Sequence, residues 1–144
     1  MESTDLKTMT ILFRTFQAVE SIARKDIANY GINMTEFAAL EALYHKGRLP
    51  VQGICSKVLI ANSSMTYVLD KLEKRQLLKR TRDQHDKRTY YVELTNQGRT
   101  FLEEIFPKHH AVMKKVFDVL SDEETEVVNE ILKKVGYYAK SLDV

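Results

Sequence analysis

The fold is decided by two neighbouring stretches, NSSMTYVLDKLEK at residues 62–74 and LKRTRDQHDKRTYYVEL at residues 78–94. Apolar residues of the first recur at spacings of three and four: Met65, Val68, Leu69 and Leu72. That period predicts a helix with one buried side. The second stretch alternates apolar and polar residues around an entirely polar centre, which predicts two short strands, 78–82 and 89–94, joined by a hairpin loop. A polar-fronted helix followed by a hairpin with a basic tip is the layout of a winged helix-turn-helix.

Helices are expected on both sides of this centre. Before it, the pattern predicts a long helix over 5–30 closed by Gly31, a second from an N-cap at Thr35 to Gly47, and a short third with Pro50 as its first residue. After it, Thr95 caps a fifth helix that Pro107 should bend or break, and Ser121 with Glu124 forms a capping box for a last helix. The expected fold is mainly α, with a small β-hairpin wing.

Composition places the chain among ordinary globular proteins. Its 144 residues include 44% hydrophobic and 29% charged residues, enough for one domain but not for two. A single cysteine excludes an intramolecular disulfide and suits a reducing compartment. The first fifteen residues mix charged and apolar positions unlike a secretory signal, and the apolar runs are too short to cross a bilayer. We therefore expect a cytoplasmic protein that does not enter a membrane.

Charge is distributed unevenly along the chain. Residues 71–90 hold eight Lys and Arg against three Asp and Glu, a net charge of +5, whereas the whole chain carries only +2. Residues 118–130 hold six acids and no Lys or Arg. A basic segment in an otherwise acidic molecule is typical of a surface that binds polyanions, although a solvated helix face would give the same pattern.

The polar side of the fourth helix and the hairpin tip are the candidate DNA contacts. Small polar groups gather in the first turn of that helix, where they could reach base edges in a major groove while the helix N–H groups meet phosphate. The expected recognition-helix contacts are Asn62, Ser63, Ser64, Thr66, Tyr67 and Lys71. The expected wing contacts are Arg82, Asp86, Lys87 and Arg88, near a minor groove or the phosphate backbone.

These residues resemble the MarR family of bacterial transcription regulators. The resemblance rests on the run 63–73, on Arg80, on the wing sequence Asp86-Lys87-Arg88, and on Leu94-Thr95 followed by Gly98, with the same helix order over essentially the whole chain. It implies that Arg88 is a wing-tip arginine inserted into the minor groove, oriented by Asp86. One departure is Gln76, where the family usually has a glycine closing the recognition helix. A left-handed Gln costs about 1 kcal/mol, so we expect the turn into Leu77-Leu78 to be shaped differently.

Three further stretches, 43–47, 105–109 and 136–140, resemble the MhqR-like branch of this family, whose members respond to quinones and hydroquinones. The resemblance implies a repressor released from a palindromic operator by a small aromatic effector. It also implies an effector pocket between the dimer helices and the winged core. The residues that we expect to line it recur at helical spacing, a pattern that also suits plain core packing: Phe13, Phe16, Phe37, Tyr44 and His45.

The terminal helices predict a homodimer. The winged core, residues 35–94, is too small to cover the broad apolar faces of the helices at 5–30 and 96–142, and a twofold copy is the commonest way to cover such faces. MarR-like proteins pair through these same helices. We therefore expect one domain over residues 1–144, with its terminal helices serving dimerisation.

Several alternatives accompany this interpretation. Cys55 could make the protein a thiol-oxidation-sensing repressor, but it falls on the apolar side of its helix, where a buried hydrophobe is the simpler reading. Zinc regulation through His45, His109 and His110 is disfavoured because the position four residues after His109 is Met113, so no metal or other cofactor is expected. A winged-helix module that docks a partner protein is a second alternative. Catalytic motifs are missing, so no catalytic residue is assigned and an enzyme is not expected.

Overall fold

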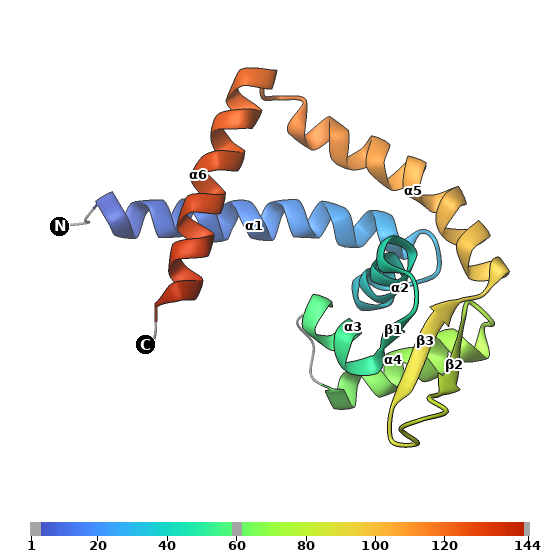
Figure 1. Ribbon diagram of the computed structural model, residues 1–144. Helices are drawn as coiled ribbons and strands as arrows, with labels where there is room; N and C mark the ends of the chain where they lie inside the picture. The colour runs from blue at the N-terminus through green and yellow to red at the C-terminus, as the bar shows by residue number, and fades with distance from the viewer. Residues whose placement is uncertain (1–3, 59–61, 143–144) are drawn as a thin grey trace.

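The computed structural model describes residues 4–58 and 62–142, with the side chains of Asp5, Val58, Asn62 and Ser63 outside that description. Along the chain lie α1 (Thr4–Ala28), α2 (Met34–Lys46), β1 (Leu49–Pro50), α3 (Val51–Val58), α4 (Asn62–Lys74), β2 (Leu78–Arg82), β3 (Tyr90–Leu94), α5 (Asn96–Phe117) and α6 (Asp122–Ser141). Figure 1 shows α2, α3, α4 and the strands gathered into one compact lobe, from which α1 and α5 extend, and α6 follows the far end of α5. The mainly helical fold with a small β wing is confirmed.

The sheet has three strands in the order β1-β3-β2, all antiparallel. The hairpin of β2 and β3 is the predicted wing, with Leu78 opposite Leu94 and Arg82 opposite Tyr90. The third strand, β1, was not predicted from the sequence; in it Leu49 pairs with Val92 and Pro50 with Tyr91. Pro50 therefore belongs to this strand, and α3 begins one residue later than predicted. Two residues give no alternating pattern, so β1 exists only because β3 is there to pair with it.

The core of this lobe is formed by the apolar sides of α2, α3 and α4 and the inner face of the wing sheet, together with Ile27 near the end of α1 and with Leu102 and Ile105 of α5. The predicted inner residues of α4, namely Met65, Val68, Leu69 and Leu72, are all buried. Leu40 and Leu43 of α2, Ile54 of α3 and Val92 of β3 are buried against them in the same cluster. The burial of these side chains fixes the orientation of α4, since complete burial of one large apolar side chain stabilises the folded state by about 1.5–3 kcal/mol.

Several helix ends follow the sequence. The capping box of Ser121 and Glu124 begins α6, and Thr95 caps α5 by accepting a hydrogen bond from the N–H of Gly98. Gly47 closes α2 with a φ of 76°. The prediction of Thr35 as the cap of α2 was wrong: Asn33 is the N-cap, and it forms a reciprocal capping box with Glu36. An Asn accepts from the N3 amide as well as a Thr does, and the glutamate three residues later favours Asn33.

Pro107 does not break α5, which runs continuously from Asn96 to Phe117. The sequence analysis expected a bend or a break there. Proline removes the hydrogen bond that its nitrogen would give to the carbonyl four residues earlier, at Glu103. Both residues are exposed, so water can hydrate that carbonyl and the helix continues.

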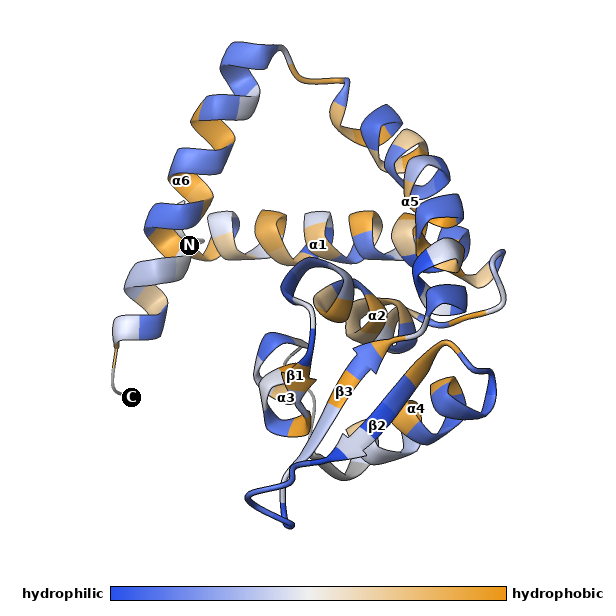
Figure 2. Ribbon diagram, turned by 45° about the vertical axis from the view of Figure 1, so that its right-hand side comes forward, coloured by the Kyte–Doolittle hydropathy of each residue, from blue (hydrophilic) through white to orange (hydrophobic). Residues whose placement is uncertain are grey.

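Two helices keep much of their apolar surface exposed (Figure 2), and α6 has no buried residue. The exposed apolar side chains of α1 are Leu6, Met9, Ile11, Leu12, Phe13, Phe16 and Ile22, and those of α6 are Val127, Val128, Ile131, Leu132, Val135, Tyr137 and Tyr138. Such extended apolar surface is unusual on a monomer and marks a contact surface. Within residues 4–58 and 62–142, none of the helices is long and apolar enough to span a bilayer.

Candidate nucleic-acid interface

The outer side of α4 presents polar side chains to solvent. Ser64, Thr66, Tyr67 and Lys71 are exposed, as predicted, opposite the buried row that attaches α4 to the core. The ammonium group of Lys71 lies 5.8 Å from the centre of the Tyr67 ring, so the two side chains share one side of the helix. The side chains of Asn62 and Ser63, also predicted contacts, lie outside the described residues.

The wing tip is shaped by Asp86. One of its carboxylate oxygens accepts a hydrogen bond from the backbone N–H of Arg88 at 3.0 Å, and the other accepts from the hydroxyl of Thr89 at 3.1 Å. The same carboxylate lies 3.7 Å from Nε of Arg88, whose side chain is 96% exposed. Asp86 therefore fixes the backbone of the tip and leaves the guanidinium of Arg88 free to reach outward.

The remaining predicted wing residues lie along the same hairpin. Lys87 is exposed at the tip, next to Arg88. Arg82, at the end of β2, lies with its guanidinium carbon 5.5 Å from the centre of the Tyr90 ring on the opposite strand. Both cations are thus at the solvent-exposed end of the wing, where they can neutralise phosphate charge.

A salt-bridge network joins the wing to α4. The guanidinium of Arg80 in β2 donates to Asp70 at 2.5 Å and to Glu73 at 3.0 Å, and its backbone N–H donates to the second oxygen of Glu73 at 3.0 Å. The side-chain hydrogen bond from Arg80 holds the pKa of Glu73 below its ordinary value of 4.5. Two acids on one helix therefore hold one arginine on the wing. Arg80 belongs to the motif quoted from the sequence, but this role for it was not predicted.

The recognition helix ends in a Schellman turn. The N–H of Leu77 donates to the carbonyl of Leu72 at 3.1 Å, and that of Gln76 donates to Glu73 at 2.9 Å. Gln76 has a φ of 63°, so the helix ends in the left-handed conformation that a glycine would adopt, and not in the differently shaped turn expected from the sequence. Leu72 and Leu77 are both buried, which supplies the apolar contact of this motif and stabilises the unfavourable Gln76 conformation.

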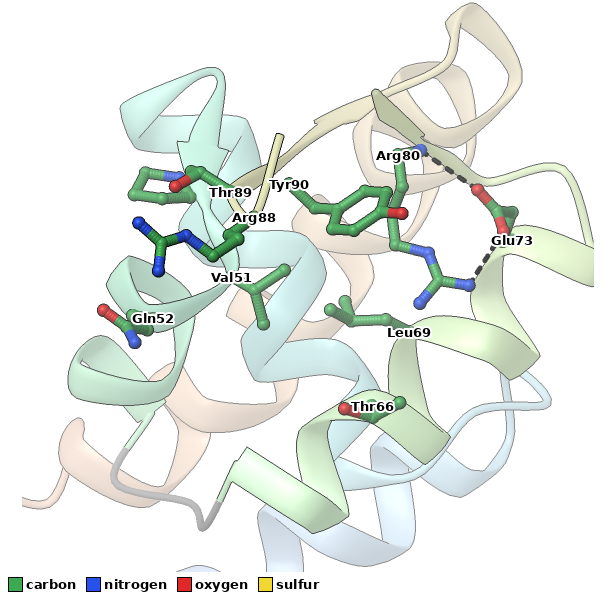
Figure 3. A pocket seen from close by; sticks show the side chains of 10 residues that line it. Val51, Gln52, Thr66, Leu69, Glu73, Arg80, Arg88, Thr89 and Tyr90 are labelled. Carbon is green, nitrogen blue, oxygen red and sulfur yellow. Dashed lines mark hydrogen bonds and ion pairs between the residues drawn. The ribbon is translucent and has the colours of Figure 1, made fainter. Parts of the chain in front are cut away.

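A cavity of about 690 Å³ opens between α4, the start of α3 and the wing. Figure 3 shows Arg88 and Gln52 on one side of it, Arg80 with Glu73 on another, and Thr66 on α4. The complete lining is Pro50, Val51, Gln52, Thr66, Leu69, Glu73, Arg80, Arg88, Thr89 and Tyr90. The cavity thus lies between the two predicted DNA-contacting elements. No sequence pattern signalled it, because β1, β3 and α4 come together only in the folded chain.

The residues predicted to line an effector pocket fall into two separate groups in the structure. Phe37, Tyr44 and His45 form an aromatic cluster with Phe106 of α5, in which ring centres lie 5.1 to 5.8 Å apart. Phe13 and Phe16, in contrast, are exposed by 58% and 63% on α1. In this chain the first group packs ring against ring, while the second belongs to the exposed apolar face of α1.

Ionic groups between α1 and α5 were not predicted. Nδ1 of His109 lies 2.8 Å from Asp26, which also accepts a hydrogen bond from the hydroxyl of Tyr30 at 3.0 Å. Burial of the Tyr30 phenol, with Asp26 beside it, raises its pKa above the ordinary value. Over the described ranges, no group of three or more His, Cys, Asp or Glu side chains is placed to hold a metal ion. Cys55 is 8% exposed on the inner side of α3.

Comparison with known proteins gives a family for this architecture. Residues 32–90 match the model described as the MarR family. The chain is 43% identical over 140 residues to the HTH-type transcriptional regulator MhqR of Bacillus subtilis, with 97% of each protein covered. That level of identity over the full length supports the MhqR-like branch.

Solved structures show the same fold. The Streptomyces coelicolor regulator Sco3205, solved in complex with DNA, matches with a TM-score of 0.86 at 21% identity and covers 94% of this chain and 91% of its own. The Bordetella bronchiseptica protein BpsR, described as regulated in DNA binding by 6-hydroxynicotinic acid, matches with a TM-score of 0.81 at 25% identity. It covers 90% of this chain and 98% of its own. These relatives are transcriptional regulators and not enzymes.

Proposed function

Because the chain belongs to the MarR family of DNA-binding transcriptional regulators, we propose that it is a homodimeric repressor that binds a palindromic operator and is released by a small aromatic effector. One observation carries the proposal: the polar side of α4 and the exposed Arg88 border the same open cavity. A helix that enters a major groove and an arginine that enters the adjacent minor groove require this juxtaposition.

Two kinds of contact contribute to DNA binding, namely contacts with phosphates and contacts with bases. Lys71, Arg82 and Lys87 neutralise phosphates, which sets the affinity and its fall with salt. Ser64, Thr66 and Tyr67 face the bases, where hydroxyl groups donate and accept hydrogen bonds in the major groove. Asn62 and Ser63 complete the same helix face in this proposal. The role of Arg80, Asp70 and Glu73 is to hold the wing at a fixed angle to α4.

The dimer is proposed from the exposed apolar rows of α1 and α6. A second copy of the chain buries both rows at once, whereas contacts among residues 4–58 and 62–142 bury none of the residues of α6. Twofold symmetry then places two copies of α4 in successive major grooves, on the order of 34–36 Å apart. We expect Ile131→Glu, in the middle of the α6 row, to give a monomer in sedimentation or light scattering. A wild-type monomer at micromolar concentration would contradict the dimer.

The effector is proposed to be a phenol or quinone. The resemblance to the MhqR-like branch suggests this class, and BpsR, described as regulated by a hydroxylated aromatic acid, supports it. The cavity between α4 and the wing is of ordinary ligand-pocket size. A ligand there would occupy space that the operator backbone and Arg88 use, whereas a ligand at the Tyr44 cluster would have to act through α5. Competition between the ligand and a half-site duplex, measured with wild type and with Tyr44→Ala, distinguishes these two locations.

Selection of bound duplexes from random DNA tests the core of the proposal. We expect an inverted repeat to be recovered, with a steep fall in affinity as salt rises. Arg88→Ala should weaken binding about 10–100-fold, and Ser64→Ala should relax the base preference at one position of each half-site. If the double variant that combines Arg88→Ala with Ser64→Ala binds the selected operator as tightly as wild type, the assignment of α4 and the wing to DNA binding fails. Binding that is insensitive to salt would instead favour the protein-docking module.

A thiol switch through Cys55 is the second candidate for regulation. The burial of Cys55 weighs against it, because a reactive thiol needs access to oxidant and a setting that favours thiolate. The operator complex of the wild-type protein should therefore survive a quinone-free oxidant as well as that of Cys55→Ser does. Release by oxidant in wild type alone would establish the thiol switch.

A further inference from the structure

The Schellman turn that ends α4 lies between the last turn of α1 and the first turn of α5. This turn, residues 75–77, is thus attached both to the turn that follows α1 and to the start of α5. Both helices leave the lobe in Figure 1, and α1 carries one of the exposed apolar rows.

The attachment to α5 is made by backbone groups of the turn. The N–H of Thr95 donates to the carbonyl of Leu77 at 3.2 Å, and its hydroxyl donates to that of Gln76 at 2.6 Å. The amide of Gln97 donates to the carbonyl of Arg75 at 3.4 Å. Gly98 approaches so closely that a Cβ there would overlap the carbonyl oxygen of Leu77. This contact does not depend on which side chain occupies position 75.

The attachment to α1 is made by the side chain of Arg75. Its Nη1 donates to the carbonyl oxygen of Gly31 at 2.9 Å, across 44 positions in the sequence. Gly31 follows the end of α1 with a φ of 80°, so this carbonyl belongs to the turn that closes the helix. The guanidinium carbon also lies 5.9 Å from the centre of the Phe101 ring on α5. A planar cation with several donors suits a carbonyl and an aromatic face together, which the ammonium group of a lysine does less well.

We propose that Arg75 is a positioning residue that fixes the orientation of α1 relative to α4 and thereby the distance between the two recognition helices of the dimer. The inference rests on the proposed dimeric DNA-binding function. Arg75 lies at the end of α4 opposite to Ser64, so the role does not require contact with bases. With the bond to Gly31 removed, α1 loses this hydrogen bond to the end of α4 but keeps its contact with α5 through Asp26 and His109. The angle between α1 and α4 is then held through α5, and the half-site distance becomes less strictly defined.

The test measures preference for half-site spacing. The selected operator is prepared with its natural spacing and with one base pair inserted or deleted between half-sites, and a duplex with a single half-site is included. Affinities are measured for wild type, Arg75→Gln, Arg75→Lys and Lys74→Gln. Lys74→Gln is the matched control because it removes one positive charge from the neighbouring exposed position. Thermal unfolding of each variant is recorded at the same protomer concentration.

We expect wild type to prefer the natural spacing by at least about tenfold and Arg75→Gln to narrow that preference to about threefold. Arg75→Lys should keep most of it, since a lysine can still donate to the Gly31 carbonyl. Lys74→Gln should keep the full preference, and all four proteins should bind the single half-site within about twofold of one another. This pattern would assign Arg75 to spacing, because lost stability or lost charge would lower every affinity alike.

The inference is overturned if Arg75→Gln keeps the wild-type preference for spacing, or if Lys74→Gln narrows that preference equally. It is also overturned if Arg75→Gln weakens binding to the single half-site by the same factor as it weakens binding to the operator. In each of these outcomes wild type still binds its operator, so the proposed function survives. A wild-type protein that shows no preference for spacing would overturn both the inference and the proposed paired binding.

Discussion

An alanine at position 98 would place its methyl carbon 1.9 Å from the carbonyl oxygen of Leu77 and 2.8 Å from the carbonyl carbon. Both atoms are backbone, so neither can rotate out of the way. The Leu77 carbonyl also accepts the hydrogen bond from the N–H of Thr95. Relief of the overlap therefore requires α5 to move away from the turn that ends α4, and the hydrogen bonds between them must lengthen.

The cost follows from these two effects. Overpacking of a closely packed contact costs about 1–3 kcal/mol, and each weakened hydrogen bond adds up to about 1 kcal/mol. We therefore expect Gly98→Ala to lower the free energy of unfolding by about 3 kcal/mol. For a chain of this length that corresponds to a fall in Tm of roughly 6–12 °C.

Gly136→Ala is the matched control. Gly136 also lies inside a helix, but a Cβ there meets no atom within 4 Å, so alanine should stabilise α6 by up to about 1 kcal/mol through helix propensity. Urea or thermal unfolding of the three proteins, at one protomer concentration, gives the comparison. Equal stability of Gly98→Ala and Gly136→Ala would refute the close approach of α5 to Leu77.

Three more changes test the same region. Gln76→Gly should stabilise by roughly 0.5–1 kcal/mol in urea unfolding, because relief of the left-handed φ of 63° exceeds the extra chain entropy of glycine, and a loss of stability would mean that the Gln76 side chain contributes more than its backbone costs. Glu73→Gln should lower the free energy of unfolding at neutral pH. Since the pKa of Glu73 in the folded protein lies below 4.5, its contribution to stability is present above that value and is lost as pH falls through the folded pKa. Plots of stability against pH for wild type and the variant should therefore converge in acid, and parallel plots would argue against the bond to Arg80. Cys55 should react with a neutral thiol reagent at least about tenfold faster in urea than in the native protein, and equal rates would show that α3 opens readily.

The elements with strong local signals could be predicted from the sequence. The row of apolar residues in α4, the polar hairpin tip, and the cap at Thr95 each depend on a few neighbouring residues, and the structure has all three. These features are fixed by backbone geometry and by the pairing of nearby groups. The left-handed position of Gln76 was not expected, because the cost of that conformation for a non-glycine residue favoured a differently shaped turn.

Features made by distant segments could not be predicted. β1 is two residues long and exists by pairing with β3, some forty positions away along the chain. The cavity beside α4 takes its lining from three separate stretches, and the bond between Arg75 and Gly31 joins side chain to carbonyl with no motif to mark either one. Residues that recur at helical spacing were misleading in another way, since Phe16 and Phe37 share a pattern but one is exposed and the other is buried.

The lack of buried residues in α6 has a consequence for how much of the protein persists in a cell. A solitary helix of 20 residues is only marginally stable in water, so α6 depends on whatever covers its apolar row. If a second copy covers it, dilution alone should melt this helix and expose it to proteases. The protein would then be degraded fastest at low concentration. A doubling of its rate of synthesis would therefore raise its abundance more than twofold.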